Sequence, residues 1–183
     1  MKTRGASLLL MMTLLLACAS PVKPPLGLAK QVDIPRFMGD WYVIAHIPTW
    51  IEKGSTNAVE SYRLDKDGAI LTTFTFHQDQ PTGPLKRYEP KGYVEDPLDH
   101  AIWGMQFMWP FKSDYRIVYL SPDYQETIIG REARDYVWIM ARTPTIPEDH
   151  YQRLTQRLQK EGYDIQVLQK VPQVWPQTKG QER

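Results

Sequence analysis

Gly39-Asp40-Trp41-Tyr42-Val43-Ile44-Ala45-His46-Ile47 is the stretch that decides the fold of this chain. Every second position from Trp41 onward is apolar, and aromatic and β-branched side chains predominate, which is typical of a β-strand. Runs of the same kind recur after it, each bounded by a turn signal such as Asp65-Lys66-Asp67-Gly68 or Ser121-Pro122-Asp123. The sequence therefore predicts an all-β domain.

The same pattern predicts eight strands in meander order, in which each strand pairs with the next along the chain. They are placed at residues 41–47, 56–64, 69–77, 85–94, 101–109, 114–120, 126–131 and 136–142. Eight antiparallel strands can close on themselves, and closure removes the exposed edges that an open sheet would leave. We therefore expect an eight-stranded antiparallel up-and-down barrel.

One α-helix is predicted after the last of these strands. Pro147 suits a first helical position, and Glu148 and Asp149 place negative charge at the positive end of the helix dipole. A single apolar stripe follows, made of Tyr151, Leu154 and Leu158. The helix is expected to cover one outer wall of the barrel, and residues 165–168 are predicted as a short last strand.

Three short motifs make the chain similar to a known family. Gly39 and Trp41 supply a Gly-x-Trp motif at the start of the first strand, and Arg142 closes the last strand. Together they resemble the end motifs of lipocalins, and Arg134-Asp135-Tyr136 resembles the bacterial outer-membrane, apolipoprotein D-like subgroup. The similarity runs from about residue 34 to about residue 170. The middle lipocalin motif, Thr-Asp-Tyr, is present only as Ser113-Asp114-Tyr115.

The resemblance implies a lipocalin barrel with a C-terminal α-helix packed outside and an internal cavity, the calyx, that binds fatty acids or lysophospholipids. It also implies a role in storing, carrying or maintaining lipids of the cell envelope. A barrel of eight strands is just wide enough to be filled by side chains or to hold one small ligand, so a closed barrel without a ligand is the alternative. Small residues predicted to point inward, such as Ala45 and Thr72, favour a cavity.

Alternation along the strands, counted with Trp41 and Arg142 as inward, predicts which side chains line the calyx. An indole stacked beneath a guanidinium plugs a barrel floor, so Gly39, Trp41 and Arg142 are assigned structural roles; the alternative places the Trp and Arg on the outer surface. The predicted ligand-binding residues are Val43, Ala45, Glu60, Tyr62, Ile70, Thr72, Phe74, Trp103, Phe107, Tyr115, Ile117, Tyr119, Trp138 and Met140.

Glu60 is the one acidic residue in this largely apolar set. An inward carboxylate is costly unless it meets a cation, a hydrogen-bond donor or water, so we expect it to contact the polar head of a ligand. The alternative is a one-residue register slip that turns Glu60 outward. The loops with Trp50-Ile51 and Trp109-Pro110-Phe111 carry large apolar side chains and are expected to touch a membrane or a partner subunit, such as a second copy in a homodimer.

The only cysteine, Cys18, follows an apolar run at residues 8–17 that is too short to span a bilayer. With Lys2 and Arg4 before it, the run predicts a secretory signal peptide over residues 1–17. The sequence around Cys18 resembles the lipobox of bacterial lipoproteins, which implies an acylated cysteine and, with no aspartate directly after it, a lipid anchor in the outer membrane. The alternative is an ordinary signal peptide with an incidental cysteine.

The remaining boundaries follow from composition. Residues 18–33 are predicted to be the acylated cysteine and a proline-rich tether, residues 34–171 the lipocalin domain, and residues 172–183 a loose C-terminal tail. Removing residues 1–17 leaves 166 residues with 20 basic and 21 acidic side chains. This balance argues against nucleic acid as a partner, because phosphate binding needs a concentrated basic surface. With one cysteine, no internal disulfide can form.

No catalytic arrangement is recognisable in the sequence. The four histidines are scattered without the spacing of metal ligands, no serine lies in a nucleophile-elbow context, and nothing predicts a metal or another cofactor. We therefore expect a binding protein and no enzyme. Two alternatives remain: the isomerase type of chemistry that a few lipocalins perform, and a structural envelope lipoprotein that docks another protein and leaves its calyx unused.

Overall fold

The computed structural model describes residues 23–175, so the predicted signal peptide, Cys18 and the end of the tail lie outside the described residues. Its strands are β1 (Gly39–Ile47), β2 (Ser55–Leu64), β3 (Ile70–Gln78), β4 (Leu85–Tyr88), β5 (Lys91–Val94), β6 (Ile102–Met108), β7 (Phe111–Leu120), β8 (Glu126–Gly130), β9 (Val137–Ala141) and β10 (Gln169–Lys170). Its helices are α1 (Ile34–Phe37), α2 (Glu148–Lys160) and the 3-10 helix η1 (Ile165–Val167).

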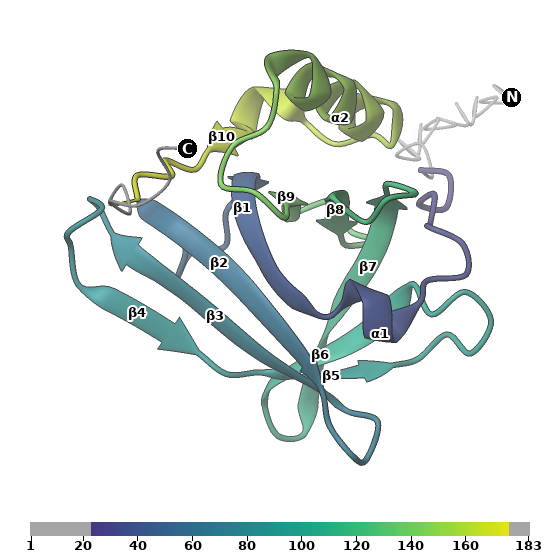
Figure 1. The fold of residues 1–183 in the computed structure, drawn as a ribbon. Helices are drawn as coiled ribbons and strands as arrows, with labels where there is room; N and C mark the ends of the chain where they lie inside the picture. Colours follow the sequence, from purple (N-terminus) through teal and green to yellow (C-terminus); the bar gives the residue numbers. More distant parts are fainter. Residues whose placement is uncertain (1–22, 176–183) are drawn as a thin grey trace, which may run out of the picture.

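The strands form a closed barrel in which neighbours along the chain are neighbours in space (Figure 1). β4 and β5 are two halves of one barrel strand, because both pair with β3 and only Glu89-Pro90 separates them. β9 pairs with β1 and closes the circle. The predicted fold class, an eight-stranded antiparallel barrel with a C-terminal helix outside, is therefore confirmed.

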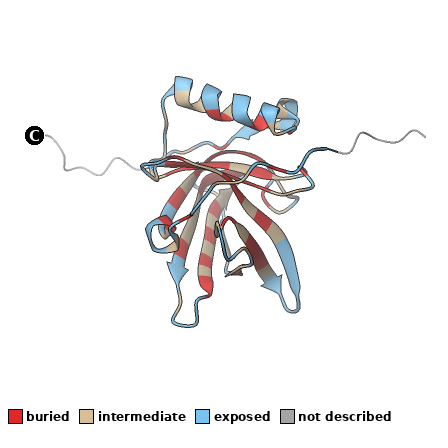
Figure 2. Cartoon of the chain, turned by 90° about the vertical axis from the view of Figure 1, so that its right-hand side faces the viewer, coloured by how far each residue is buried: buried red, intermediate tan, exposed pale blue. Residues whose placement is uncertain are grey.

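Two layers of apolar side chains hold the barrel together. One fills its interior around Trp41 and Ile117, and the other lies between the outer wall and α2. In Figure 2 the buried positions of α2 lie on the side that faces the barrel. Leu154 and Leu158 are fully buried there beside Val137, as the apolar stripe predicts, and each such side chain stabilises the docking by about 1.5 to 3 kcal/mol.

Two β-bulges change which side chains face the interior. In the β1–β9 pairing, Val43 lies opposite Met140 but Ala45 lies opposite Ile139, so one extra residue enters β1. A bulge reverses the alternation beyond it. Ala45 therefore packs in the outer layer beneath α2, and its prediction as a calyx residue is wrong.

The second bulge lies between β7 and β8, after Ile117. It turns Tyr119 outward, where the guanidinium of Arg157 on α2 lies 4.5 Å from the centre of its ring. The prediction that Tyr119 lines the calyx is therefore also wrong. In both strands the chain is regular up to the bulge, and Val43 and Ile117 face the interior.

The described part of the predicted tether packs against the barrel. Leu26 and Val32 are buried, the Ala29 N–H donates to the Ile117 carbonyl (2.9 Å), and the Val32 N–H donates to the Asp99 carbonyl (2.8 Å). Residues 24–33 are thus part of the domain, and the tether prediction is wrong for them. Two apolar anchors, spaced six residues apart, give this segment the packing energy that a free linker lacks.

The C-terminal segment differs from the prediction in two respects. Residues 165–168 contain the 3-10 helix η1, and the short strand β10 begins only at Gln169. The tail remains bound as far as residue 175: the Gln173 amide donates to the Val43 carbonyl (2.9 Å), and Asn57 exchanges two hydrogen bonds with Val174. The Gln173 bond satisfies a carbonyl beside the β1 bulge, and the Asn57 side chain satisfies both backbone groups of Val174, so the segment is not loose there.

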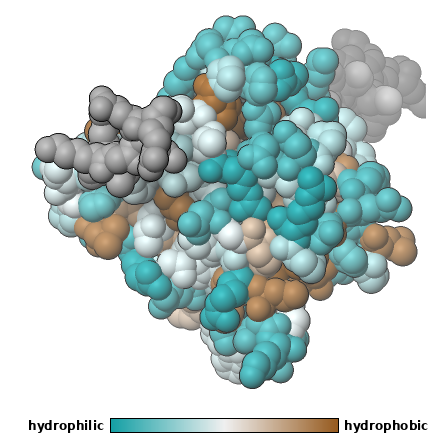
Figure 3. Space-filling model, viewed as in Figure 1, coloured by the Kyte–Doolittle hydropathy of each residue, from teal (hydrophilic) through white to brown (hydrophobic). Residues whose placement is uncertain are grey.

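The surface of the described chain is mainly polar. Figure 3 shows hydrophilic side chains over most of one face, with hydrophobic side chains in separate patches. Between residues 23 and 175, no helix combines the length and the apolar character that crossing a membrane requires.

Candidate ligand-binding site

One end of the barrel is sealed by an aromatic plug. Trp41 is fully buried, its indole N–H donates to the Phe37 carbonyl (2.9 Å), and its ring stacks on that of Phe37 with centroids 4.9 Å apart. The guanidinium of Arg142 lies 3.9 Å from the centre of the Trp41 ring. It also donates hydrogen bonds to the carbonyls of Phe37, Met38 and Asp40, at 2.8 to 2.9 Å.

Local sequence explains why these groups meet. The Asp33 side chain caps α1 by accepting a hydrogen bond from the Arg36 N–H (3.1 Å), and Gly39 has a φ of +98°, which lets the chain turn from α1 into β1. A cation at the carbonyl end of α1 is favourable for the helix dipole. Arg142 therefore joins the helix, the first strand and the last barrel strand at the closed end.

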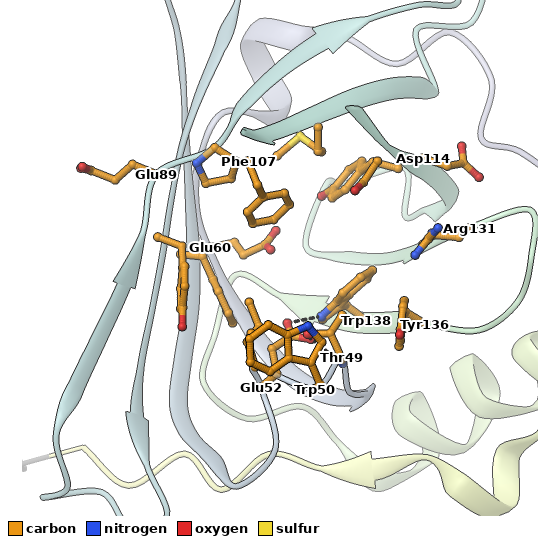
Figure 4. A pocket seen from close by; sticks show the side chains of 17 residues that line it. Thr49, Trp50, Glu52, Glu60, Glu89, Phe107, Asp114, Arg131, Tyr136 and Trp138 are labelled. Atoms are coloured by element: carbon orange, nitrogen blue, oxygen red, sulfur yellow. Dashed lines mark hydrogen bonds between the residues drawn. The ribbon is translucent and has the colours of Figure 1, made fainter. Parts of the chain in front are cut away.

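The opposite end is open and leads into a cavity of about 580 Å³. We call this open end the mouth; the β1–β2, β3–β4, β6–β7 and β8–β9 loops surround it. The apolar part of the cavity wall is formed by Trp50, Ile51, Phe74, Tyr88, Pro90, Met105, Phe107, Tyr115 and Trp138. Its polar part is formed by Thr49, Glu52, Glu60, Glu89, Ser113, Asp114, Arg131 and Tyr136. Side chains from opposite walls point into one common space (Figure 4).

The structure divides the predicted calyx residues into two levels. The residues that line the cavity are Glu60, Phe74, Phe107, Tyr115 and Trp138. The residues that lie in the interior beyond it, without lining it, are Val43, Tyr62, Ile70, Thr72, Trp103, Ile117 and Met140. Alternation along a strand predicts which way a side chain points, but it does not predict how much of the barrel interior is filled by side chains. Here the aromatic plug fills the closed half of the barrel. These seven residues point into the barrel as predicted but lie in its closed half, and a role in ligand binding stays a prediction for them.

Aromatic contacts show how the closed half is filled. Trp103 stacks on Tyr115 with ring centroids 5.3 Å apart and meets Phe37 edge-on at 5.4 Å. Tyr62 joins the same cluster, 5.6 Å from Phe37 and 5.9 Å from Trp103. The cluster is continuous with the Trp41 plug and forms the solid base on which the cavity rests.

Glu60 lies at the inner end of this cavity. It is the cross-strand partner of Trp41, and Figure 4 shows its carboxyl group pointing into the open space. The Tyr62 hydroxyl donates to the Glu60 carboxyl and also bonds the Tyr115 hydroxyl. Burial, and secondarily the negative charge of Glu52, raises the pKa of Glu60 to about 8. At neutral pH the group is therefore mostly uncharged and can donate a hydrogen bond.

Glu52 fixes the β1–β2 loop across the mouth. One carboxylate oxygen accepts from the Thr49 N–H (2.8 Å) and hydroxyl (2.7 Å), and the other accepts from the Trp138 indole N–H (2.8 Å; Figure 4). The loop is thereby tied to a wall residue 86 positions away. Glu52 was not among the predicted site residues, because a single loop carboxylate gives no local sequence signal of such a contact.

Other wall residues were also missed. Tyr88 lies opposite Phe74, so extending the alternation across the strand pair would have found it. Arg131 comes from the β8–β9 loop, where no periodicity applies, and its Nε atom is buried without a hydrogen-bond partner among the described residues. His46 lies opposite Trp138 on the inner face of the wall, and burial lowers its pKa to about 4.

The described part of the chain contains no cluster of potential metal ligands. From residue 23 to residue 175, no three His, Cys, Asp or Glu side chains are grouped in a way that would hold a metal ion. What the arrangement offers is an enclosed apolar space with a hydrogen-bonding acid at its inner end. A barrel sealed at one end and open to such a space at the other defines a calyx-type binding protein.

Comparisons with known proteins agree with this class. The family model for a lipocalin-like domain matches residues 32–173, so the chain belongs to the lipocalin family. Temperature-induced lipocalin-1 of Arabidopsis thaliana is 32% identical over 82% of this chain and 84% of its own length. The outer membrane lipoprotein Blc of Escherichia coli strain K12 is 30% identical over 91% of this chain and 92% of its own length. The chain is therefore a lipocalin of the bacterial type.

The fold also matches solved lipocalin structures. Insecticyanin from the tobacco hornworm superposes with a TM-score of 0.65, covering 85% of this chain and 87% of that one at 13% identity. At that identity the likeness supports the shared barrel alone. Lipocalins are in general binding proteins, which agrees with an enclosed, largely apolar cavity.

Proposed function

We propose that this lipocalin binds the acyl chain of a fatty acid or lysophospholipid in its calyx and carries such lipids at the outer membrane, where acyl groups on Cys18 anchor it. The observation that carries the proposal is the cavity of about 580 Å³ with predominantly aromatic and aliphatic walls. Its volume lies in the range that holds small ligands. The similarity to a protein named an outer membrane lipoprotein supports the location. The proposal assigns binding and no catalytic step.

The apolar wall can supply the affinity that a carrier needs. Burying a chain of roughly sixteen carbons at about 0.8 kcal/mol per methylene gives at most about 12 kcal/mol. Association costs of roughly 4 kcal/mol or more reduce this gain. The remainder corresponds to a dissociation constant in the micromolar range or below.

Glu60 is proposed to recognise the polar group of the ligand. Below pH 8 its protonated carboxyl donates a hydrogen bond to a ligand oxygen, whereas above pH 8 it is charged, because its pKa is about 8. The charged form repels the carboxylate of a fatty acid and attracts the cationic head of a lysophospholipid. The choice between the two lipid classes should therefore depend on pH.

The first test is direct identification of the occupant. Organic-solvent extraction of the purified protein, followed by mass spectrometry, should release an acyl lipid in an amount close to one per chain. An empty barrel that also fails to bind added palmitate would contradict the carrier function and favour a docking role.

The second test measures binding by calorimetry in variants of one wall residue. Trp138→Ala should weaken binding of palmitate by about tenfold, since it removes apolar contact area worth at least about 1.4 kcal/mol. Trp138→Phe keeps a ring but loses the bond to Glu52, which separates contact area from loop position. Trp175→Ala is the matched control, because Trp175 packs against Tyr42 and does not line the cavity. Equal affinity in the parent and in Trp138→Ala would exclude this cavity as the binding site.

The third test concerns the head group. The parent should lose affinity for palmitate between pH 6.5 and pH 9 relative to a lysophospholipid with a quaternary ammonium head. Glu60→Gln should bind both lipids with the same preference at both pH values. A pH-dependent preference that persists in Glu60→Gln would show that another group recognises the polar head of the ligand.

A further inference from the structure

Large apolar side chains gather at the mouth without cover from any other described residue. Trp50 in the β1–β2 loop is 81% exposed and Trp109 in the β6–β7 hairpin is 82% exposed. Phe107, Met108 and Phe111 beside Trp109 are more than half exposed. We call these five residues the apolar rim. Scattered exposed apolar residues are normal, but four of them on one hairpin and a fifth on a second loop at the same opening indicate an interaction surface.

The β6–β7 hairpin extends beyond the end of the neighbouring strand β8. β7 is paired with β8 only as far as Arg116, and it continues for five more residues to Phe111. At about 3.3 Å per residue, the tip extends roughly 16 Å past the end of β8, measured along the strand. The tip itself, Met108-Trp109-Pro110-Phe111, is apolar. Such a projecting aromatic tip suits the interfacial layer of a bilayer, where an indole finds both apolar and polar surroundings.

The N-terminal segment enters the described structure beside the same mouth. The Pro24 carbonyl accepts a hydrogen bond (2.6 Å) from the guanidinium of Arg134, which lies in the β8–β9 loop. Arg131 and Tyr136 of that loop line the cavity, so Pro24 is held by a loop that forms part of the mouth. From there the chain runs along the barrel wall, past Ile117, toward α1 at the closed end.

Chain length then limits where the membrane can lie. Six peptide units separate Cys18 from Pro24. A chain spans at most about 3.6 Å per residue, so an acyl group on Cys18 keeps Pro24 within roughly 20 Å of the bilayer surface. This distance is close to the length by which β7 extends past the end of β8. The same bilayer that holds the anchor is thus within reach of the hairpin tip.

We propose that the apolar rim docks on the surface of the bilayer, so that the mouth of the calyx opens toward the lipid from which ligands are taken or to which they are delivered. The proposal rests on the proposed Cys18 anchor for its orientation. The choice of residues that touch lipid rests instead on the exposure of the apolar rim. With the mouth against the membrane, an acyl chain moves between bilayer and calyx with little exposure to water, which avoids the cost of hydrating it.

The test is quenching of tryptophan fluorescence by vesicles whose phospholipid acyl chains carry bromine. It uses the mature acylated chain and a mature-length Cys18→Ser chain, both at saturating lipid. In the acylated parent, brominated vesicles should quench the red-shifted emission of exposed indoles relative to plain vesicles. The double variant Trp50→Gln/Trp109→Gln should lose at least three quarters of that quenching. Trp175→Gln, which removes a partly exposed indole away from the rim, should match the parent.

The outcomes separate the anchor from the rim. If both chains are released equally when the vesicles are diluted, the anchor proposal fails, and the quenching pattern still decides whether the rim contacts lipid. If the acylated chain pellets but its quenching is unchanged in the double variant, the rim proposal is wrong while the anchor stands. Analytical ultracentrifugation without lipid adds one more outcome: a stable dimer that the double variant converts to monomer would assign the rim to a second copy of the chain and overturn docking on the bilayer.

Discussion

Trp41→Ala is the sharpest test of how the barrel is closed. The parent indole is fully buried between the ring of Phe37 and the guanidinium of Arg142. An aromatic side chain buries about 150 to 250 Å². At about 25 cal/mol per Å², the loss amounts to roughly 4 to 6 kcal/mol, which is an upper bound because unfolded chains already bury part of this surface.

Two further contributions refine the magnitude. The stacked guanidinium adds about 1 to 2 kcal/mol that the alanine variant forfeits. The lost indole hydrogen bond adds little, because the Phe37 carbonyl still accepts a bond from Arg142 (2.9 Å) and is not left unsatisfied. Partial relaxation around the cavity offsets some of the cost. We therefore expect the free energy of unfolding to fall by about 3 to 5 kcal/mol, as for other buried aromatic residues replaced by alanine.

Urea denaturation followed by circular dichroism measures this change. Trp175→Ala is the control, because that side chain is 42% exposed, and it should cost less than about 1 kcal/mol. A double-mutant cycle with Arg142→Ala should give a coupling energy of about 1 to 2 kcal/mol between the two plug residues. A loss below about 1 kcal/mol in Trp41→Ala would refute the plug, since the Trp41 indole could then not be buried at the closed end.

Three other predictions concern the anchor and the buried titratable groups. Cys18→Ser should release the chain from the membrane fraction or block its processing, because several acyl chains hold a protein to a membrane almost irreversibly whereas one gives marginal binding. A correctly cleaved Cys18→Ser chain that stays in the membrane fraction would contradict acylation at this position. The folded-state pKa of Glu60, about 8, lies above the ordinary 4.5, so unfolding releases a proton between these pH values and the free energy of unfolding should fall as pH rises from 4.5 to 8. Glu60→Gln should flatten this fall in urea titrations at pH 5, 7 and 9. A pH profile identical to that of the parent would mean that Glu60 is not buried. The pKa of His46 is lowered to about 4 from 6.5, so unfolding takes up a proton and the free energy of unfolding should fall as pH drops from 6.5 to 4. His46→Gln should reduce this acid sensitivity. An unchanged midpoint of acid unfolding would mean that His46 is exposed to water.

Local pattern in the sequence was sufficient for the architecture. The eight barrel strands, the outer helix and the closed end were predictable because each depends on a short-range property: a period of two along the strands, an apolar stripe on a helix, and paired motifs at Gly39, Trp41 and Arg142. β4 and β5 were predicted as one strand, and they do form one barrel strand with a break at Pro90. Proline lacks the N–H that the ladder needs, which accounts for the break.

Tertiary structure alone decided the composition of the site. One extra residue in β1 turns Ala45 from the calyx to the outer layer, and one in β7 does the same to Tyr119, because a strand with a period of two exchanges its faces at every bulge. The height of the plug decides that Trp103 is core and Trp138 is cavity wall, although both point inward. The bond from Trp138 to Glu52 joins residues 86 positions apart, and the bond from Arg134 to Pro24 joins residues 110 apart. Local periodicity carries no information about such pairs, since they exist only once the barrel has closed and brought its loops to one end.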